Sequence, residues 1–300
     1  MTLTALTAFL MCVVALKMGR RGWPALAAVL VLVASPAYML WSRAAPDALH
    51  SLPFVLAWLC SVIEYERHLN RWWLVASGLI LGVGCYSSTP AIVLMPVYLL
   101  VTLIPVHTRT ERSVSTSAAV LAAFVVPTVF GMAMLARDPS IYADYVQRYR
   151  IYDAHRLTPL QGLKDFLNYD NVQERISVYW DYFDPVYLFA AGGADTPTVR
   201  AGVLPLAAAV LVPLGIAQLL GRGTVAGGIV IAGIATAPLA AILVDERYVA
   251  RRELVLLPFA ALAAAAGIEY GLSRGWIWRL TTWALLTLTA VQAAMYWVRG

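Results

Sequence analysis

Long apolar stretches recur along this chain of 300 residues, and short polar connections separate most of them. A helix needs about 20 apolar residues, within a range of about 17–25, to cross a bilayer. Because lipid offers the backbone no hydrogen-bond partners, such stretches are expected to be helical. The pattern predicts an all-α, polytopic integral membrane protein with about ten transmembrane helices. The predicted spans are Thr2–Leu16, Trp23–Trp41, Asp47–Ile63, Trp72–Tyr86, Pro90–Val106, Ser115–Ala136, Ala201–Leu220, Thr224–Val244, Glu253–Leu272 and Trp276–Val298.

One long polar segment, residues 137–200, interrupts this pattern. It divides the chain into an N-terminal transmembrane bundle (1–136), an outer loop (137–200) and a C-terminal transmembrane bundle (201–300). Thr158 before Pro159, and Asn171 three residues before Glu174, are typical of helix starts. We therefore expect short interfacial helices in this loop. Its tyrosines at spacings of i, i+3, i+7 and i+10 share one helix face; they are Tyr142, Tyr145, Tyr149 and Tyr152.

Basic residues are concentrated in alternate short loops, which the positive-inside rule assigns to the cytoplasm. The other side then holds the loop 137–200 and the turn from Asp245 to Glu253. The pattern predicts a multi-pass protein of the cell membrane with its long loop on the outer, periplasmic or extracellular side. The basic residues that define the cytoplasmic loops are Lys17, Arg20, Arg21, Arg67, Arg71, Arg109, Arg112, Arg222, Arg274 and Arg279.

The composition agrees with a membrane protein, since 61% of the residues are hydrophobic and 13% are charged. Soluble domains have roughly 45–50% apolar and about 25% charged residues. The net charge of +5 comes from arginines scattered over the loops, so nucleic-acid binding is not indicated. No ionisable residue lies near the centre of an apolar stretch, which argues against a proton-coupled pump. Cys12, Cys60 and Cys85 lie within apolar stretches and are interpreted as small hydrophobic residues.

The stretch from Trp41 to Phe54 is the first in which ionisable residues meet a membrane boundary opposite the basic loops. Arg43, Asp47 and His50, at i, i+4 and i+7, share one stripe of a helix. Asp47 is then either a helix-start residue, stabilised by the helix dipole, or a functional carboxylate. A divalent metal on Asp47 and His50 is a weaker alternative, because two ligands do not make a site.

Aromatic residues are dense near the end of the long loop, at Tyr179, Trp180, Tyr182 and Phe183. Tyrosine and tryptophan favour the headgroup level of a bilayer, so these residues can form an interfacial belt. They can also form a platform for a sugar ring or a lipid headgroup. The two interpretations are compatible.

Three segments resemble GT-C fold glycosyltransferases of the protein O-mannosyltransferase and aminoarabinose transferase type. The run RRGWPALAAVLVLVASPAYMLWSRAAPDAL is similar to that family's second to fourth spans, with a basic turn, an S-P ending and S-R-x-x-x-x-D-A-L. The run VYWDYFDPVYLFAAGGADTPTVRAGVLPL resembles a later Tyr-rich stretch. The run DERYVARRELVLLPF resembles the penultimate outer turn. Together they follow the family order along most of the chain.

The resemblance implies transfer of a sugar from a polyprenyl-phosphate donor to a glycan, lipid or protein acceptor on the outer side of the membrane. In that family an acidic residue of the first outer loop acts as a base or orients the acceptor, and a second acid stands where Asp47 stands. Sugar transfer needs a general base for the acceptor hydroxyl, and Asp47 is the candidate for that role in this chain. Family arginines near the outer face hold the lipid phosphate, whereas each alone could be an interfacial anchor to anionic headgroups. The residues expected to bind substrate are Arg43, His50, Tyr179, Tyr182, Arg200, Arg247, Tyr248 and Arg252.

The chain departs from the family pattern at its beginning, where the first span and first acidic outer loop are absent. The chain is then either truncated at its beginning or a diverged member, and an upstream reading frame that encodes one more span and an outer loop with paired acids would favour the enzyme interpretation. The rival interpretation is a non-enzymatic polytopic protein, such as a lipid or polysaccharide transporter or an assembly subunit.

Overall fold

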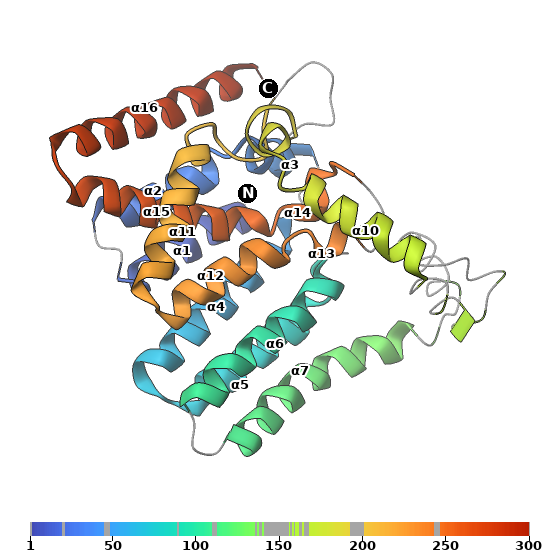
Figure 1. Cartoon of the computed structure of the whole chain (residues 1–300). Coiled ribbons are helices and arrows are strands. Elements are labelled where there is room, and N and C mark those ends of the chain that lie inside the picture. The colour runs from blue at the N-terminus through green and yellow to red at the C-terminus, as the bar shows by residue number, and fades with distance from the viewer. Residues whose placement is uncertain are drawn as a thin grey trace.

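A computed structural model describes residues 2–19, 22–44, 49–88, 90–109, 113–135, 168–192, 201–242 and 247–299, with isolated positions between 137 and 164. Its elements are helices, which confirms the all-α prediction for this part of the chain (Figure 1). The first half contains α1 (Thr2–Lys17), α2 (Trp23–Val33), α3 (Pro36–Ala44), α4 (Ser51–His68), α5 (Arg71–Gly84), α6 (Ala91–Arg109) and α7 (Ser113–Leu135).

The second half begins with α10 (Tyr169–Asp181) and a short π-helix, η2 (Tyr187–Ala191). The predicted start of α10 at Asn171 was slightly wrong, because the helix begins two residues earlier, with Asn168 at its N-cap. The Thr158 start has one expected feature, since the Thr158 N–H donates to Gln161 Oε1 over 3.0 Å. The remaining helices are α11 (Ala208–Arg222), α12 (Val225–Thr236), α13 (Leu239–Ile242), α14 (Ala250–Glu253), α15 (Leu256–Ser273) and α16 (Trp276–Arg299).

Each predicted span contains a helix, but ten complete spans are not shown. Within the described residues, three segments are long and apolar enough to cross a membrane: Val114–Gly131, Val225–Ile242 and Leu256–Ser273. A fourth is possible if α2 and α3 form one bent span. Shorter apolar helices accompany them, including α1, α5, α6 and α11. A polytopic membrane protein agrees with this set, while the division into three parts stays a prediction.

The predicted span Trp23–Trp41 is broken, because α2 and α3 meet at an angle of 54°. Pro36 explains the break, since proline has no N–H to donate to the carbonyl of Leu32 and its ring clashes with a continuing helix. The Ser35 N–H bonds to that carbonyl instead, over 3.2 Å. The Ser35 hydroxyl donates to the Val31 carbonyl over 2.6 Å. The bend therefore leaves few backbone groups unsatisfied.

Helix α15 forms the centre of the packed bundle and is buried along most of its length. It packs against α11, α2 and α12. Glycines bring α11 and α15 close together: a Cβ built at Gly215 would lie 1.7 Å from the Ala263 carbonyl oxygen, and one at Gly267 would lie 2.2 Å from that of Leu211. Small residues at a crossing let two backbones approach, as is typical of helices packed in membranes.

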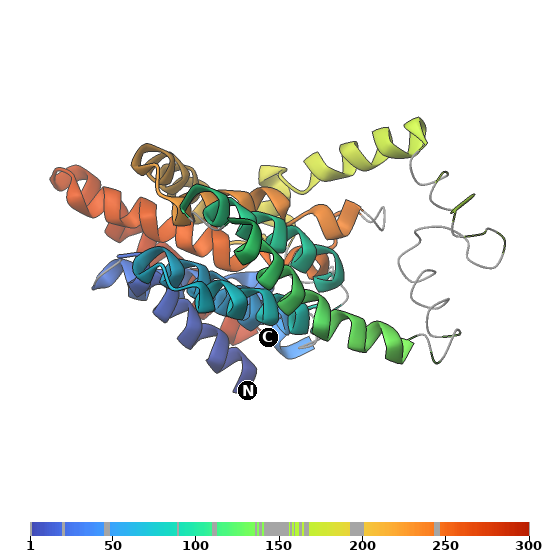
Figure 2. The same ribbon diagram turned by 90° about the horizontal axis from the view of Figure 1, so that it is seen from below.

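The bundle has two distinguishable ends. At the end that we call the basic end, α1, α4, α11 and α15 come together; Arg67 Nη2 donates to the Lys17 carbonyl, and Arg222 pairs with Glu269. The other, which we call the loop end, carries α10, η2 and α14, and α10 projects from the bundle there (Figures 1 and 2). The polar contacts of the structure thus group the predicted cytoplasmic loops together, and the side of the membrane that each end faces stays a prediction.

Candidate functional site

A cavity of about 650 Å³ lies at the loop end, between α1, α2, α3 and α16. Its walls are mostly aliphatic, and Arg43, in the last turn of α3, is the one charged residue among the described residues that line it. The Tyr38 hydroxyl, also in the lining, donates to the Thr4 carbonyl over 3.1 Å and ties α3 to α1. The lining residues are Leu3, Thr4, Thr7, Leu30, Val33, Ala34, Tyr38, Met39, Ser42, Arg43, Leu49, Ala293 and Ala294.

The predicted stripe of Arg43, Asp47 and His50 is only partly described. Arg43 is exposed, and His50 is half-buried directly before α4. Asp47 lies outside the described residues. Arg43 and Leu49, which lie on either side of it in the sequence, both line the cavity, whereas His50 is not among the lining residues. One end of the predicted stripe is thus brought to the cavity, and its carboxylate stays a prediction.

The aromatic residues of α10 pack against the C-terminal bundle. Tyr179 is half-buried, and its hydroxyl donates to the Ala235 carbonyl over 2.8 Å. Tyr182 has no exposed surface, and its hydroxyl accepts from the Val249 N–H over 3.1 Å. These contacts attach α10 to α12 and to the turn before α14. Trp180, in contrast, is 66% exposed, so it is better placed for an interfacial belt.

The predicted phosphate-binding turn lies beside α10. Arg247 is exposed, and its Nη1 is 3.2 Å from Asp181 Oδ2, so a neighbouring carboxylate compensates its charge. Tyr248 is 44% exposed, and Arg252 is buried in α14. Arg200 lies outside the described residues. The turn thus brings Arg247 and Tyr248 together with α10, while Arg252 faces the interior.

Glu253 was not among the residues expected from the sequence to form a site. It is the last residue of α14, ahead of the apolar segment Leu256–Ser273, and it has no exposed surface. Neither carboxylate oxygen has a hydrogen-bond partner within the described residues. Burial raises the pKa of Glu253 well above its ordinary value, and the hydroxyl of nearby Tyr187 opposes that rise. The sequence gives no signal for Glu253 as a site residue, because Glu253 is one of several charges of both signs in this turn.

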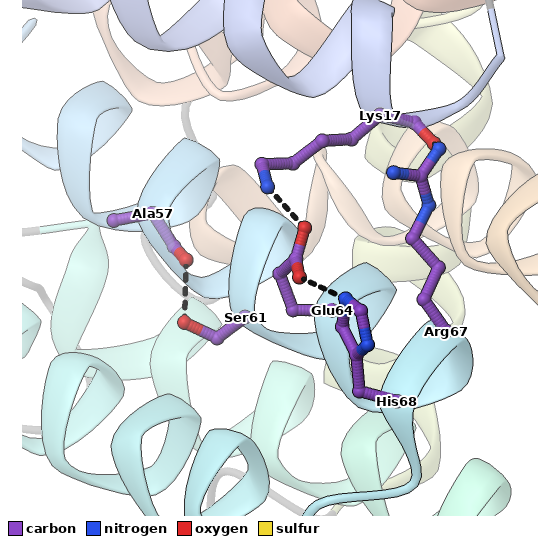
Figure 3. Close-up of polar contacts among 6 residues, drawn as sticks. All are labelled: Lys17, Ala57, Ser61, Glu64, Arg67 and His68. Carbon is purple, nitrogen blue, oxygen red and sulfur yellow. Dashed lines mark hydrogen bonds and ion pairs between the residues drawn. The ribbon is translucent and has the colours of Figure 1, made fainter.

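The basic end holds a different polar cluster, shown in Figure 3. Glu64 in α4 is buried, and its carboxylate pairs with Lys17 of α1 and with His68 Nε2, the latter over 3.2 Å. Arg67 Nη2 donates to the Lys17 carbonyl over 2.6 Å. Each oxygen of Glu64 therefore has a basic side chain beside it, and the cluster fastens α1 to α4. No group of three or more His, Cys, Asp or Glu side chains in the described ranges is placed to hold a metal ion.

Comparison with known families gives one match. Residues 1–142 match the family described as dolichyl-phosphate-mannose-protein mannosyltransferase. This confirms the GT-C glycosyltransferase resemblance over that part of the chain, which includes Arg43, Asp47 and His50. No curated protein and no solved structure matches the chain.

Proposed function

We propose that this chain is a membrane glycosyltransferase that takes a sugar from a polyprenyl-phosphate donor and transfers it to an acceptor at the outer face of the membrane. The observation that carries the proposal is the cavity at the loop end, with its aliphatic walls and the guanidinium of Arg43. Aliphatic walls suit an isoprenoid chain, which binds by burying apolar surface. A guanidinium suits a phosphate, which it can bind with two parallel hydrogen bonds.

The family match supports the same assignment, because it covers the helices that form three walls of the cavity, α1, α2 and α3. Family membership over this region suggests a membrane glycosyltransferase that depends on a polyprenyl-phosphate sugar. In our proposal the donor's isoprenoid chain lies between these helices and α16. The donor's phosphate then lies beside Arg43.

The reaction is a substitution at the anomeric carbon of the donor sugar. We assign Asp47 the role of general base, which takes the proton of the acceptor hydroxyl while its oxygen bonds to the anomeric carbon. The bond between that carbon and the phosphate oxygen breaks, and its electron pair leaves with polyprenyl phosphate. Arg43 stabilises the charge that develops on this leaving group. His50, next along the chain, is a candidate to orient the acceptor. Arg200, Arg247 and Arg252 remain further candidates for phosphate contacts.

Replacing Asp47 by Asn is the decisive test of the catalytic assignment. Asn caps a helix about as well as Asp, so a helix-start role alone predicts little change. A positioned base is worth about 100- to 10,000-fold in rate, so the proposal predicts loss of most transfer. The assay measures sugar transfer from polyprenyl-phosphate mannose in membranes that contain the full gene product, alongside protein abundance. Glu269→Gln, at the basic end, is the control for loss of a carboxylate. Normal abundance with retained transfer would refute the assignment.

A second variant tests the cavity itself. Ala293→Trp places a large ring among the lining residues and should weaken binding of the donor lipid about tenfold or more, since the cavity can then no longer hold the isoprenoid chain. Leu288→Trp, on the same helix at a position that is 41% exposed, should leave donor binding unchanged. Equal donor binding by both variants would place the donor elsewhere.

A further inference from the structure

A second, smaller pocket lies at the loop end, between η2 and the turn that contains Tyr248. Its volume is about 240 Å³. It shares no lining residue with the donor cavity. Its lining residues are Asp184, Val186, Tyr187, Ala191, Gly192 and Tyr248. It therefore forms a separate site in the described part of the chain.

Two tyrosine rings form one side of this pocket. The rings of Tyr187 and Tyr248 have centroids 5.3 Å apart and planes inclined by 51°. Tyr187 is buried and is backed by the ring of Tyr182, which meets it edge to face at 5.4 Å. Tyr248 is the exposed member of the pair, so it offers a ring face to a ligand, while the two buried rings fix its position.

The backbone of Tyr248 is held in an unfavourable conformation. Its φ of 58° lies in the left-handed region, which a bulky aromatic residue rarely adopts. The Val249 N–H, which donates to the Tyr182 hydroxyl, fixes the backbone on one side of Tyr248, and the exposed Arg247–Asp181 ion pair lies on the other. Strained residues that the surrounding structure maintains are concentrated at ligand sites. The strain at Tyr248 therefore indicates a ligand site at this ring.

The charge of the described lining disfavours a second phosphate site. Asp184 is the one charged residue among the described lining residues, and none of them is a Lys or Arg. Asp184 Oδ1 accepts the Val186 N–H over 2.9 Å. A carboxylate repels a phosphate but accepts hydrogen bonds from hydroxyl groups. A sugar ring combines such hydroxyl groups with C–H faces that pack on aromatic rings, whose faces carry partial negative charge.

A buried polar group behind Tyr187 is the second indication of a polar ligand. Glu253 has no exposed surface and no hydrogen bond on either oxygen within the described residues. Tyr187, which lines the pocket, lies near enough to influence this carboxyl electrostatically. Burying a carboxyl costs free energy, and this one lies close to a ring that lines the pocket, so it adds a polar group near the site.

We propose that this pocket binds one sugar ring of a carbohydrate acceptor, stacked on Tyr248 and hydrogen-bonded by Asp184. That the bound sugar belongs to the acceptor rests on the proposed function, whereas the binding of a sugar ring in this pocket does not depend on it. The pocket thereby gives a substrate class to a reaction whose acceptor the family match leaves open.

The test measures binding of methyl α-mannoside, methyl β-glucoside and methyl β-galactoside to the purified protein by saturation-transfer NMR. At least one glycoside should bind to the native protein. Tyr248→Ala should weaken its binding about tenfold, whereas Tyr248→Phe should keep it within about threefold, since it retains the ring. Tyr248→Gly removes the ring while relieving the backbone strain, so it should behave as Tyr248→Ala even if the alanine variant folds poorly. Trp276→Ala, which removes an exposed ring at the start of α16 and outside the pocket, should change nothing.

Three results would overturn the proposal: no binding of any glycoside, equal binding by the native protein and Tyr248→Gly, or binding of tetramethylammonium alone, which marks a cation site. Donor binding reports separately on the proposed function. Glycoside binding that depends on Tyr248, in a protein that transfers no sugar, would refute the transferase and leave the sugar site. Transfer to a carbohydrate with unchanged acceptor KM in Tyr248→Gly would refute the site and leave the transferase.

Discussion

Two buried glutamates, one at each end of the bundle, differ in the charged groups that surround them. Glu64 at the basic end pairs with Lys17 and His68, and Arg67 reinforces the cluster through the Lys17 carbonyl (Figure 3). Glu253 at the loop end is more completely buried and has no hydrogen-bond partner in the described part of the chain. Both residues lie close to the end of an apolar helix, so neither location nor residue type distinguishes them.

The comparison separates a structural carboxylate from a candidate functional one. Removing a carboxylate from water is costly, and nearby cations offset this at Glu64. At Glu253 burial raises the pKa, which favours the neutral form of the carboxyl. A neutral buried carboxyl can donate a hydrogen bond as well as accept one. We therefore expect Glu64 to matter mainly for stability and Glu253 to matter for the pocket beside Tyr187.

The largest expected effect comes from breaking the pair at the basic end. Lys17→Met leaves Glu64 buried beside His68 alone and should lower the free energy of unfolding by about 2–3 kcal/mol, less than the roughly 3–5 kcal/mol typical of fully buried pairs, because the Lys17 side chain is 29% exposed. Denaturant unfolding in detergent micelles measures this. The double variant Lys17→Met/Glu64→Gln removes the charge as well and should regain much of the loss. A double variant as unstable as the single one would show that packing, not charge, matters here.

An intermediate effect, dependent on pH, should come from Glu253→Gln. Below the ordinary pKa of 4.5 the carboxyl is protonated in both folded and unfolded protein, so the change has little effect. As pH rises, the unfolded chain releases this proton while the folded protein keeps it, which destabilises the native protein up to the raised pKa. The glutamine variant lacks this loss, so its melting temperature should exceed that of the native protein by a margin that grows as the pH rises above the ordinary pKa and levels off at the raised one.

Glu64→Gln is the matched control for that experiment, because it makes the same change at the other buried glutamate. It should destabilise the protein at pH 8, since Lys17 loses its charged partner. A margin for Glu253→Gln that does not vary with pH would mean that Glu253 is ionised in the folded protein and has a partner after all.

The smallest effects should come from the exposed ion pairs at the two ends. Arg247→Ala removes the pair with Asp181, and Arg222→Ala removes the pair with Glu269, in which Nη2 and Oε1 are 2.8 Å apart. Solvent screens both pairs, so each change should cost about 0.2–1 kcal/mol in unfolding free energy and less in high salt. A much larger loss for Arg247→Ala would show that this pair maintains the Tyr248 turn. The two ends would then differ in backbone strain as well as in how their buried charges are compensated.

The sequence alone determined the helical elements of this protein and their approximate bounds. An apolar stretch long enough to enter a bilayer is a local property, and it forms a helix whatever its neighbours are, because lipid leaves the backbone no other partners. Pro36 also carries the reason for the bend in the second predicted span. The motifs from Arg20 to Leu49 carried the family resemblance, which the match over residues 1–142 confirms.

Only the tertiary structure decided which polar groups have partners. Lys17 and Glu64 are 47 residues apart, and no spacing rule joins them; the packing of α1 against α4 does. Tyr182, predicted as part of a surface platform, is buried because α10 packs on the turn before α14. In the sequence Glu253 is one of several charges in a polar turn, whereas in the structure it is the fully buried last residue of α14. Periodicity in the sequence shows which face of a helix is apolar. Burial and charge compensation depend on which helices pack together, and the residues that determine this are spread over the whole chain.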